Sequence, residues 1–277
     1  MGTPFFNIYK IHSFTFALSS TVTEIEEELA SFFSSLITEK GIPSKEFSIN
    51  RNNLDFFTLY EDNTLLLESD NIDFVLEQLE WTATLRILEH LSKFLHLHAS
   101  GVSVDGKALL FTGPPGSGKT VMVLSLLLKG YSCLSDEIIL IDPDTLTAHP
   151  FPRSFHIEKE VIKLFPELTR MITFSPHPDS SGKVRFDPGL ISNGWIAEPS
   201  VPRWVIFIDY KPEHGNIFSP VGKTQALSLL VEQAVNLADY GEGGIDVLVK
   251  LVQQCECYML KSGNLKSAAG MLKEIIV

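Results

Sequence analysis

The strongest chemical signal in the sequence is a glycine-rich octapeptide that ends in a lysine and a threonine. Residues 113–120 fit the pattern G-x-x-x-x-G-K-[ST] in full. The glycines let backbone N–H groups turn toward phosphate oxygens, the lysine can reach the β and γ phosphates, and the threonine hydroxyl suits a Mg²⁺ ion. The pattern therefore predicts a nucleotide-binding loop made by Gly113, Pro114, Pro115, Gly116, Ser117, Gly118, Lys119 and Thr120.

The residues around this loop have the patterns of the strand and helix that it requires. The apolar run before the loop predicts a strand, and the run after it predicts an amphipathic helix that closes at Gly130. Further upstream, two short strand-like runs are joined across Asp105 and Gly106, a pair typical of a two-residue hairpin. His98 lies just upstream of this predicted hairpin. A plain phosphate loop has no such hairpin before it.

Two adjacent carboxylates, Asp136 and Glu137, stand just before the next apolar run, seventeen and eighteen residues after Lys119. Successive side chains of an extended chain point to opposite sides, so the two carboxylates have different surroundings. One could hold Mg²⁺ while the other accepts the proton of an incoming hydroxyl, a division of roles known for phosphoryl transfer. The alternative is a solvated acidic pair at a strand edge.

An ordinary NTPase would instead carry its metal-binding carboxylate at the end of an apolar strand. Asp209 and Asp142 each end such a run. An aspartate in this position also commonly caps the turn that follows it. The second candidate function is therefore a P-loop ATPase or nucleotide-regulated switch without a phosphoryl acceptor. A third is regulatory nucleotide binding beside an N-terminal partner-binding module.

Three stretches together resemble a known family. They read HASGVSVDGKALLFTGPPGSGKT (98–120), GYSCLSDEIILID (130–142) and PFPRSFHIEKE (150–160). They are similar to the catalytic domain of HPr kinase/phosphorylase and its relatives, a fold related to phosphoenolpyruvate carboxykinase. The resemblance covers roughly residues 95–157.

The resemblance implies a role for each residue that matches. ATP would bind on the loop, Mg²⁺ would be held by Thr120 with Asp136 or Glu137, and Asp136 would take the proton of a serine hydroxyl. His98 would lie beside that carboxylate, tuning its proton affinity or contacting the metal. The chain carries Asp-Glu where the bifunctional enzymes carry two aspartates, so it looks more like the stand-alone HPr-kinase-related proteins. We expect an ATP-dependent serine kinase that acts on a peptide or protein, with a precursor peptide as one candidate.

A kinase of this kind needs cations that offset the charge on the transferred phosphoryl group. Arg153, shortly after the acidic pair, is the first candidate for this catalytic role beside Lys119. Lys183, Arg185 and Arg203 flank a polar middle region and are further candidates. The alternatives are a surface salt bridge for Arg153 and solvation for the others.

The order of patterns along the chain predicts an α/β protein in two parts. Residues 1–70 are expected to form a small N-terminal α/β domain, with a hairpin around residues 61–63. Residues 71–277 are expected to form a P-loop kinase domain of the HPr kinase C-terminal type. Apolar residues at helical spacing from residue 72 to residue 95 predict a long helix that opens this second domain.

Composition limits the classes of partner. With 34 acidic against 22 basic side chains the net charge is −12, so a nucleic-acid partner is not expected. No run is long enough to cross a bilayer and no secretory signal opens the chain, so we expect a cytoplasmic protein that does not bind membranes. The three cysteines are expected to pack in the core, including Cys255 and Cys257, rather than to bind metal. The sequence does not decide whether the protein forms a homo-oligomer.

Overall fold

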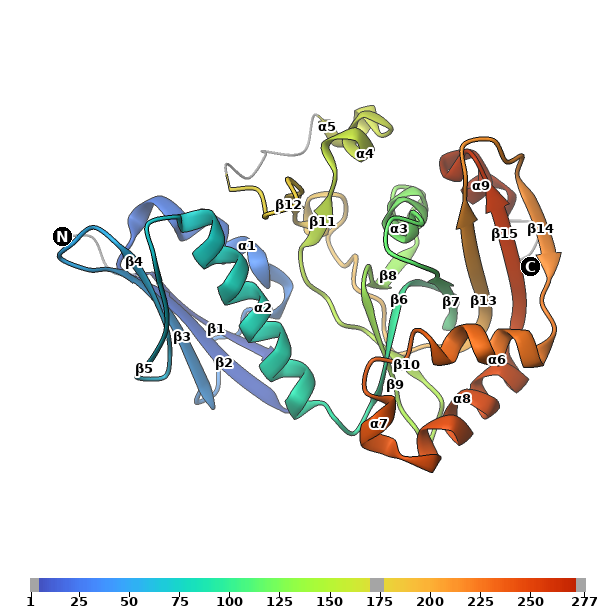
Figure 1. Ribbon diagram of the computed structural model, residues 1–277, viewed down its shortest axis with the longest axis horizontal. Coiled ribbons are helices and arrows are strands. Elements are labelled where there is room, and N and C mark those ends of the chain that lie inside the picture. Colours follow the sequence, from blue (N-terminus) through green and yellow to red (C-terminus); the bar gives the residue numbers. More distant parts are fainter. Residues whose placement is uncertain (1–4, 170–176, 273–277) are drawn as a thin grey trace. The chain divides into compact units, whose positions relative to one another are not determined.

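The phosphate-loop sequence lies in the second of two units into which the chain divides. The computed structural model describes residues 5–169 and 177–272. Unit 1 combines residues 1–91 with residues 153–190, and unit 2 combines residues 92–152 with residues 191–277. Both units mix helices and sheets, in line with the predicted α/β class (Figure 1). The division differs from the expected boundary after residue 70, because unit 1 also takes the following helix and a distant segment.

Unit 1 is built on a sheet whose strands lie in chain order. Strands β2 and β3 pair in parallel, and the other neighbouring strands pair antiparallel. The predicted hairpin around residues 61–63 is confirmed as the β4–β5 turn, where Asp62 adopts a left-handed conformation with φ of 55°. The strands are β1 (Phe5–Ile11), β2 (Phe14–Ser20), β3 (Lys45–Arg51), β4 (Phe57–Glu61) and β5 (Thr64–Ser69).

Two helices belong to this sheet, α1 (Glu26–Phe32) and α2 (Ile72–His90). Helix α2 begins where its apolar spacing predicts and is capped by Asn71, whose side chain accepts from the N–H of Phe74. It contacts β3, β4 and β5 and buries one face that includes Val75, Leu79 and Ala83, which explains why it belongs to unit 1. It ends earlier than expected, since residues from Leu95 onward form a strand. No helix of the described residues is both long enough and apolar enough to span a bilayer.

The distant segment of unit 1 is held by buried charges. It contains β11 (Phe155–Ile157), β12 (Val184–Phe186), α4 (Lys159–Lys163) and α5 (Pro166–Thr169). Arg185, only 3% exposed, donates from Nε to Glu80 at 2.8 Å and from Nη1 to Glu28 at 2.9 Å. His156 contacts Glu80 through Nε2 at 2.9 Å and Asp179 through Nδ1 at 3.0 Å. The sequence offers Arg185 as a further candidate cation or as a solvated side chain; instead it is a buried structural cation, and two carboxylates compensate for its burial.

The carboxylate of Glu80 is the centre of this network. Burial raises its pKa, but the neighbouring cations His156 and Arg185 outweigh that effect and lower the pKa to about 2. Burial lowers the pKa of His156, but the neighbouring carboxylates of Glu80 and Asp179 outweigh this effect and raise it. Glu80 and His156 are therefore both charged between about pH 2 and the raised pKa of His156.

Unit 2 is built on a mixed sheet in the order β10-β9-β6-β7-β13-β15-β14, with β8 paired to β6. Strands β7, β13 and β15 run parallel to one another, and their neighbours pair antiparallel. The strands are β6 (Leu95–Val104), β7 (Lys107–Thr112), β8 (Ser132–Ser135), β9 (Ile138–Ile141), β10 (Ala148–His149), β13 (Val201–Tyr210), β14 (Ile217–Pro220) and β15 (Glu256–Ser262). The helices are α3 (Lys119–Leu127), α6 (Lys223–Val231), α7 (Leu237–Tyr240), α8 (Glu242–Gln254) and α9 (Leu265–Met271).

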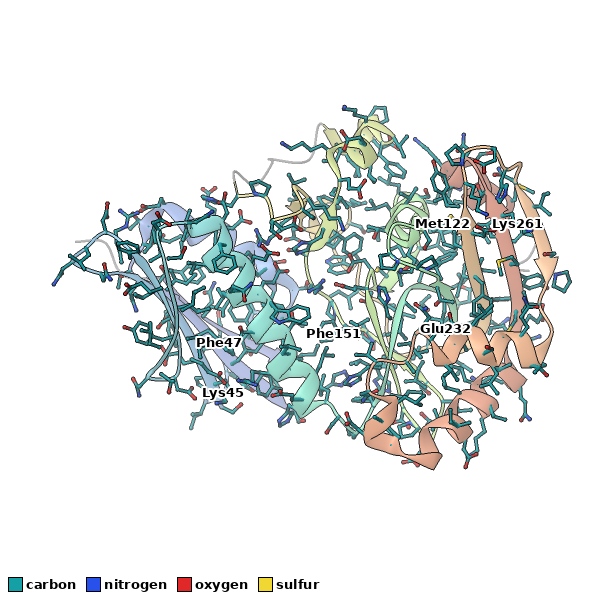
Figure 2. All side chains as sticks on the ribbon, in the orientation of Figure 1. Lys45, Phe47, Met122, Phe151, Glu232 and Lys261 are labelled. Atoms are coloured by element: carbon teal, nitrogen blue, oxygen red, sulfur yellow. The ribbon has the colours of Figure 1, made fainter. Side chains whose placement is uncertain are left out.

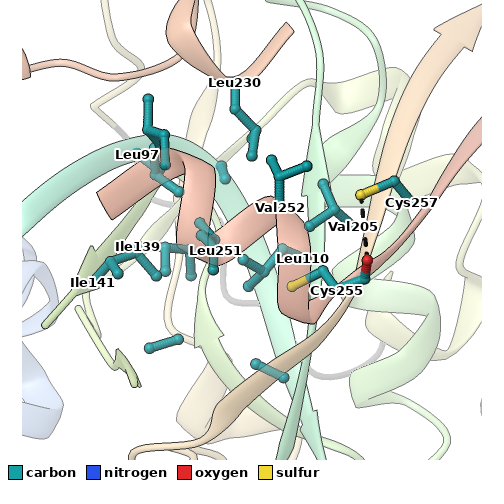
Figure 3. Close-up of a cluster of buried hydrophobic side chains, with 14 of the residues drawn as sticks. Leu97, Leu110, Ile139, Ile141, Val205, Leu230, Leu251, Val252, Cys255 and Cys257 are labelled. Carbon is teal, nitrogen blue, oxygen red and sulfur yellow. Dashed lines mark hydrogen bonds between the residues drawn. The ribbon is translucent and has the colours of Figure 1, made fainter. Parts of the chain in front are cut away.

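One buried cluster joins the sheet of unit 2 to helices α6 and α8 (Figure 3). It includes Leu97 and Val205 from the sheet and Leu251 from α8. Cys255 and Cys257 belong to it too, which confirms that they pack in the core. Burial raises the pKa of the Cys255 thiol to about 12, so this side chain stays protonated at neutral pH. Within the described residues, no cluster of three or more His, Cys, Asp or Glu could hold a metal ion.

We predict that Glu80→Gln destabilises unit 1 by about 1–3 kcal/mol near pH 6, because Arg185 and His156 each lose one buried carboxylate partner while Glu28 and Asp179 remain beside them. Glu80 contributes fully above its ordinary pKa of 4.5 and loses this contribution as the pH falls toward about 2. His156 contributes fully below its ordinary pKa of 6.5 and loses its contribution at higher pH, above its raised pKa.

The measurement is amide hydrogen exchange by mass spectrometry, which follows the amides of unit 1 apart from those of unit 2. The matched control is Glu89→Gln on the exposed side of the same helix, which should change the free energy of opening little. Equal effects of the two substitutions, or a Glu80→Gln deficit that does not shrink between pH 4.5 and pH 2, would contradict the assigned role of Glu80.

Candidate functional site

The predicted phosphate loop connects the end of β7 to the start of α3, as such a loop requires. Gly118 caps α3 in a left-handed conformation with φ of 89°, and a Cβ atom there would lie 1.9 Å from Leu265 of α9. A Cβ on Gly113 would lie 2.9 Å from the carbonyl oxygen of Ile208. These two positions therefore accept only glycine without rearrangement. The first N–H groups of an α-helix such as α3 lack partners in their own helix, which favours an anion at this end.

Lys119 lies folded across the loop. Its Nζ donates to the carbonyl oxygen of Gly113 at 2.8 Å and to that of Pro114 at 3.3 Å, and the residue is only 7% exposed. The ammonium charge is thus held at the centre of the turn. A phosphate oxygen would offer this lysine a charge-assisted contact, which is stronger than a hydrogen bond to a neutral carbonyl.

Two buried hydroxyls at the loop, of Thr112 and Ser117, form no hydrogen bond within the described residues. They are 0% and 5% exposed, and both residues line the pocket described below. A buried polar group without a partner costs free energy, and in native structures such groups usually face a ligand, an ion or water. These hydroxyls are therefore placed to bond an acceptor-rich ligand.

Strand β6 connects the loop with the acidic pair. On one side of β6, Ala99 pairs with Thr112, the residue directly before the loop. On the other side, His98 pairs with Ile138, the residue directly after Glu137. Loop and acidic pair therefore flank β6 at the same level, with backbones separated by about two strand spacings, or about 10 Å. His98 lies inside β6 between them, because this strand extends back to Leu95.

The acidic pair forms the turn between β8 and β9, both of which pair with β6. The Ser135 hydroxyl accepts from the N–H groups of Glu137 and Ile138 at 3.2 and 3.1 Å and so fixes this turn. Asp136 is 6% exposed and Glu137 is half-buried. The two neighbouring carboxylates thus have different surroundings, as the sequence predicts.

His98 is an uncharged residue at neutral pH. Burial is the larger effect and the charge of Lys119 the second; together they lower the pKa of His98 below its ordinary value, although a bond to the Gln233 side chain raises it. Its backbone N–H donates to the Gln233 carbonyl at 2.7 Å. The histidine is thus positioned from the segment after α6 and is close enough to sense the loop lysine.

A pocket of about 620 Å³ opens beside the loop, a size typical of small-molecule sites. It runs over the carboxyl ends of the parallel strands, where ligands of such sheets usually bind. The register of β13 and β15 brings Asp209 beside Lys261, and Figure 2 labels Lys261 on β15 and Glu232 just after α6. The lining residues are Thr112–Ser117, Phe207–Tyr210, Ser219–Val221, Gln225, Leu229, Glu232, Gln233, Met259 and Lys261.

The two aspartates offered as metal ligands of an ordinary NTPase, Asp142 and Asp209, lie in different places. Asp142 follows the end of β9 that pairs with Leu95, which is the end away from the loop. Its carboxylate accepts from the N–H groups of Asp144 and Thr145 at 2.9 Å each, so it caps the turn and is wrong as a metal candidate. Asp209 lines the pocket, and it stays a candidate for the NTPase alternative.

Arg153 is not brought to the loop within unit 2. It belongs to unit 1, where its Nη1 lies 3.9 Å from Glu80, and its side chain is 11% exposed. This pairing is buried, in contrast to the surface salt bridge that the sequence offers as the alternative. A catalytic role for Arg153 stays a prediction.

The residues predicted to hold Mg²⁺ fit this ion by their chemistry. Thr120 is the second residue of α3, and Asp136 and Glu137 form the turn on the other side of β6. All three supply oxygen donors, which Mg²⁺ prefers. Magnesium commonly uses one or two carboxylates and takes its other ligands from phosphate and water, so a larger acidic cluster is not required.

Sequence reasoning missed four residues that line the pocket, namely Gln225, Glu232, Gln233 and Lys261. Gln233 lies more than 100 residues from the loop in the chain, and Lys261 reaches it only through the parallel pairing of β15 with β13. None of them belongs to a short motif. No local signal could have identified them.

We predict that Lys119→Met raises the pKa of His98 while leaving it below the ordinary value, because a neighbouring positive charge is removed and burial remains. The measurement is an NMR titration of the imidazole Cε1–H resonance, assigned with His98→Gln. The control is Lys129→Met, beyond the far end of α3. An unchanged pKa in Lys119→Met, or an equal shift in the control, would contradict the coupling.

Comparisons with known proteins give limited information. No family model matches the chain, and no curated protein matches it in sequence. Among solved structures it is similar to the Hpr(Ser) kinase/phosphatase from Coxiella burnetii, with 10% sequence identity and a TM-score of 0.34 over 65% of this chain and 95% of that chain.

Proposed function

We propose that unit 2 is the catalytic unit of an ATP- and Mg²⁺-dependent serine kinase that acts on a peptide or protein. The observation that carries this proposal is the placement of the loop and the acidic pair on the two sides of β6 at the level of His98. A phosphate donor on one side and a carboxylate base on the other are the two parts that transfer to a hydroxyl requires.

The phosphates of ATP would bind on residues 113–120, and the nucleoside would extend into the adjoining pocket. Lys119 would exchange its carbonyl partners for phosphate oxygens, and the Thr112 and Ser117 hydroxyls would donate to the same ligand. Thr120 with Asp136 or Glu137 would hold Mg²⁺, which would neutralise charge on the phosphates and orient them. Lys119, the two hydroxyls and Mg²⁺ would thus all interact with the negatively charged phosphates of ATP.

Asp136 would act as the base in the transfer step. The serine oxygen forms a bond to the γ-phosphorus while the bond from that phosphorus to the bridging oxygen breaks, which releases ADP. The serine proton passes to the Asp136 carboxylate. His98, uncharged and inside β6, would tune the proton affinity of this carboxylate without adding a competing positive charge.

The first test is transfer of labelled γ-phosphoryl from ATP with Mg²⁺ onto serine-bearing peptides and host extract, read by mass spectrometry. We expect a phosphoserine product that disappears in Lys119→Ala. We also expect Asp136→Asn to lower the transfer rate by about 100- to 10,000-fold, the usual contribution of a general base, with little change in ATP affinity.

Asp142→Asn is the matched control, since Asp142 lies beyond the opposite end of β9 and only caps a turn. It should keep near-normal transfer. Full transfer in Asp136→Asn, or loss of ATP binding in that variant, would count against Asp136 as the base.

The second candidate function, an ATPase or nucleotide-regulated switch, is favoured by the presence of Asp209 in the pocket. In that case ATP turnover would release free phosphate without any acceptor, and Asp209→Asn would abolish it while Asp136→Asn would not. Tight ATP binding without turnover, even with acceptors present, would favour a purely regulatory role.

A further inference from the structure

The outer edge of β5 in unit 1 is unpaired within the described residues. β5 is the last strand of its sheet and pairs only with β4. The opposite edge is partly covered, since Tyr9 of β1 bridges to Ile37 and the N–H of Thr38 donates to Ile8 at 2.9 Å. β5 reads Thr-Leu-Leu-Leu-Glu-Ser and contains neither lysine nor proline, the residues that commonly protect an edge strand. It therefore offers free backbone groups to another strand.

Helix α2 carries an apolar stripe beside this edge. Phe74, Gln78, Trp81 and Leu85 follow one another at helical spacing on the side away from the buried face of α2. Three of the four are apolar, and Trp81 is 60% exposed. A groove of about 320 Å³ lies between this helix and strands β4 and β5, lined by Trp81 and Leu85 from α2, by Leu59 of β4 and by residues of β5. The helix thus exposes apolar area at this groove.

The strand itself directs two leucines at this groove. The pairing of β4 with β5 shifts register at Leu66, which lies between the paired residues Leu65 and Leu67. A bulge of this kind redirects a side chain, and both Leu66 and Leu67 line the groove. An exposed edge with apolar pockets for alternate side chains is the arrangement by which sheets bind extended peptides.

The charge of this part of the chain sets the kind of segment that fits. Residues 1–91 contain 15 Asp and Glu against five Lys and Arg, and five minus fifteen gives −10, most of the −12 of the whole chain. The cation at the groove, Arg86, is already paired with Glu61 and Glu89 at 2.8 and 3.0 Å. Glu68 and Asp70 at the end of β5 are exposed. A segment with lysine or arginine side chains is therefore complementary in charge.

We propose that the β5 edge and its groove bind an extended, cationic segment of the polypeptide that carries the acceptor serine. The segment would add as a sixth strand beside β5, with alternate apolar side chains in the groove and its basic side chains toward the acidic surface. This proposal rests on the kinase function proposed above for the identity of the bound polypeptide, but its binding step can be measured without any catalysis.

The binding test uses the fluorescence of Trp81, since Trp195 and Trp204 are buried at 4% and 3% exposure in unit 2. The probes are a serine-free decapeptide of alternating valine and lysine and the same peptide with glutamate in place of lysine. We expect saturable binding of the lysine peptide alone, weakened at least about tenfold in Leu66→Lys, a change that adds a repelling charge.

The matched control is Ile42→Lys, an equal change at an apolar side chain of unit 1 that is 91% exposed and does not line the groove. It should leave binding unchanged. The proposal is overturned if no saturable change occurs, if the glutamate peptide binds equally, or if Leu66→Lys and Ile42→Lys behave alike. Self-association that Leu66→Lys abolishes, without peptide binding, would overturn it in favour of a second copy of the chain.

A kinetic arm separates this proposal from the kinase proposal. Serine peptides fused to the lysine segment should show a KM at least about tenfold lower than those fused to the glutamate segment, with kcat unchanged, and Leu66→Lys should remove the difference. Binding without any phosphoryl transfer would overturn the kinase function and leave the docking site intact. Phosphoryl transfer with the same KM for both fused segments would support the kinase function and overturn the docking site.

Discussion

The arrangement of the candidate site depends on strand β6, which pairs with β7 on one side and with both β8 and β9 on the other. A strand can hold two neighbours only at fixed spacing and register, so this pairing fixes the loop of residues 113–120 relative to the Asp136–Glu137 turn. The register also explains why His98 lies between them. A slip of one residue would turn His98 to the other face of the sheet and separate the three parts.

The electrostatics of the site follow from this geometry. Lys119 is buried in the loop, and burial together with this nearby positive charge lowers the pKa of the His98 imidazole. The Gly113 and Pro114 carbonyls hold the Lys119 ammonium group at the centre of the loop. Across β6, the buried carboxylate of Asp136 is held by a turn that the Ser135 hydroxyl fixes. Opposite charges at a set separation, each with limited access to water, are suited to hold a phosphate donor and a proton acceptor apart until a hydroxyl enters.

In unit 1, buried charges attach residues 153–190 to the first part of the chain. Residues 153–190 return to the first part of the chain, and buried ion pairs of Arg185 and His156 with Glu28 and Glu80 connect them. The Arg185 guanidinium also lies 4.6 Å from the centre of the Phe32 ring. Such pairs do little for net stability compared with apolar packing, but removal of one partner leaves a buried charge, so they make the register of the segment specific.

The sequence by itself determined the local chemistry. It predicted the strand, loop and helix around residues 113–120, the hairpins at Asp105–Gly106 and at residues 61–63, and the start of α2, because turn residues, glycines and apolar spacing act within a few positions. It also predicted core packing for the cysteines. Its expectation for Arg185 was wrong and the domain boundary differed, since burial and unit membership depend on residues far away in the chain.

Only the tertiary structure decided which carboxylates lie near the loop. Asp142 and Asp209 look alike in sequence, yet β9 runs antiparallel to β6 and carries Asp142 away, whereas β13 runs parallel to β7 and brings Asp209 to the pocket. Strand direction, register and the pairing of residues more than 50 positions apart are set by long-range contacts, which a local pattern cannot specify. The residues and their chemistry were therefore readable from the sequence, and their placement beside one another required the fold.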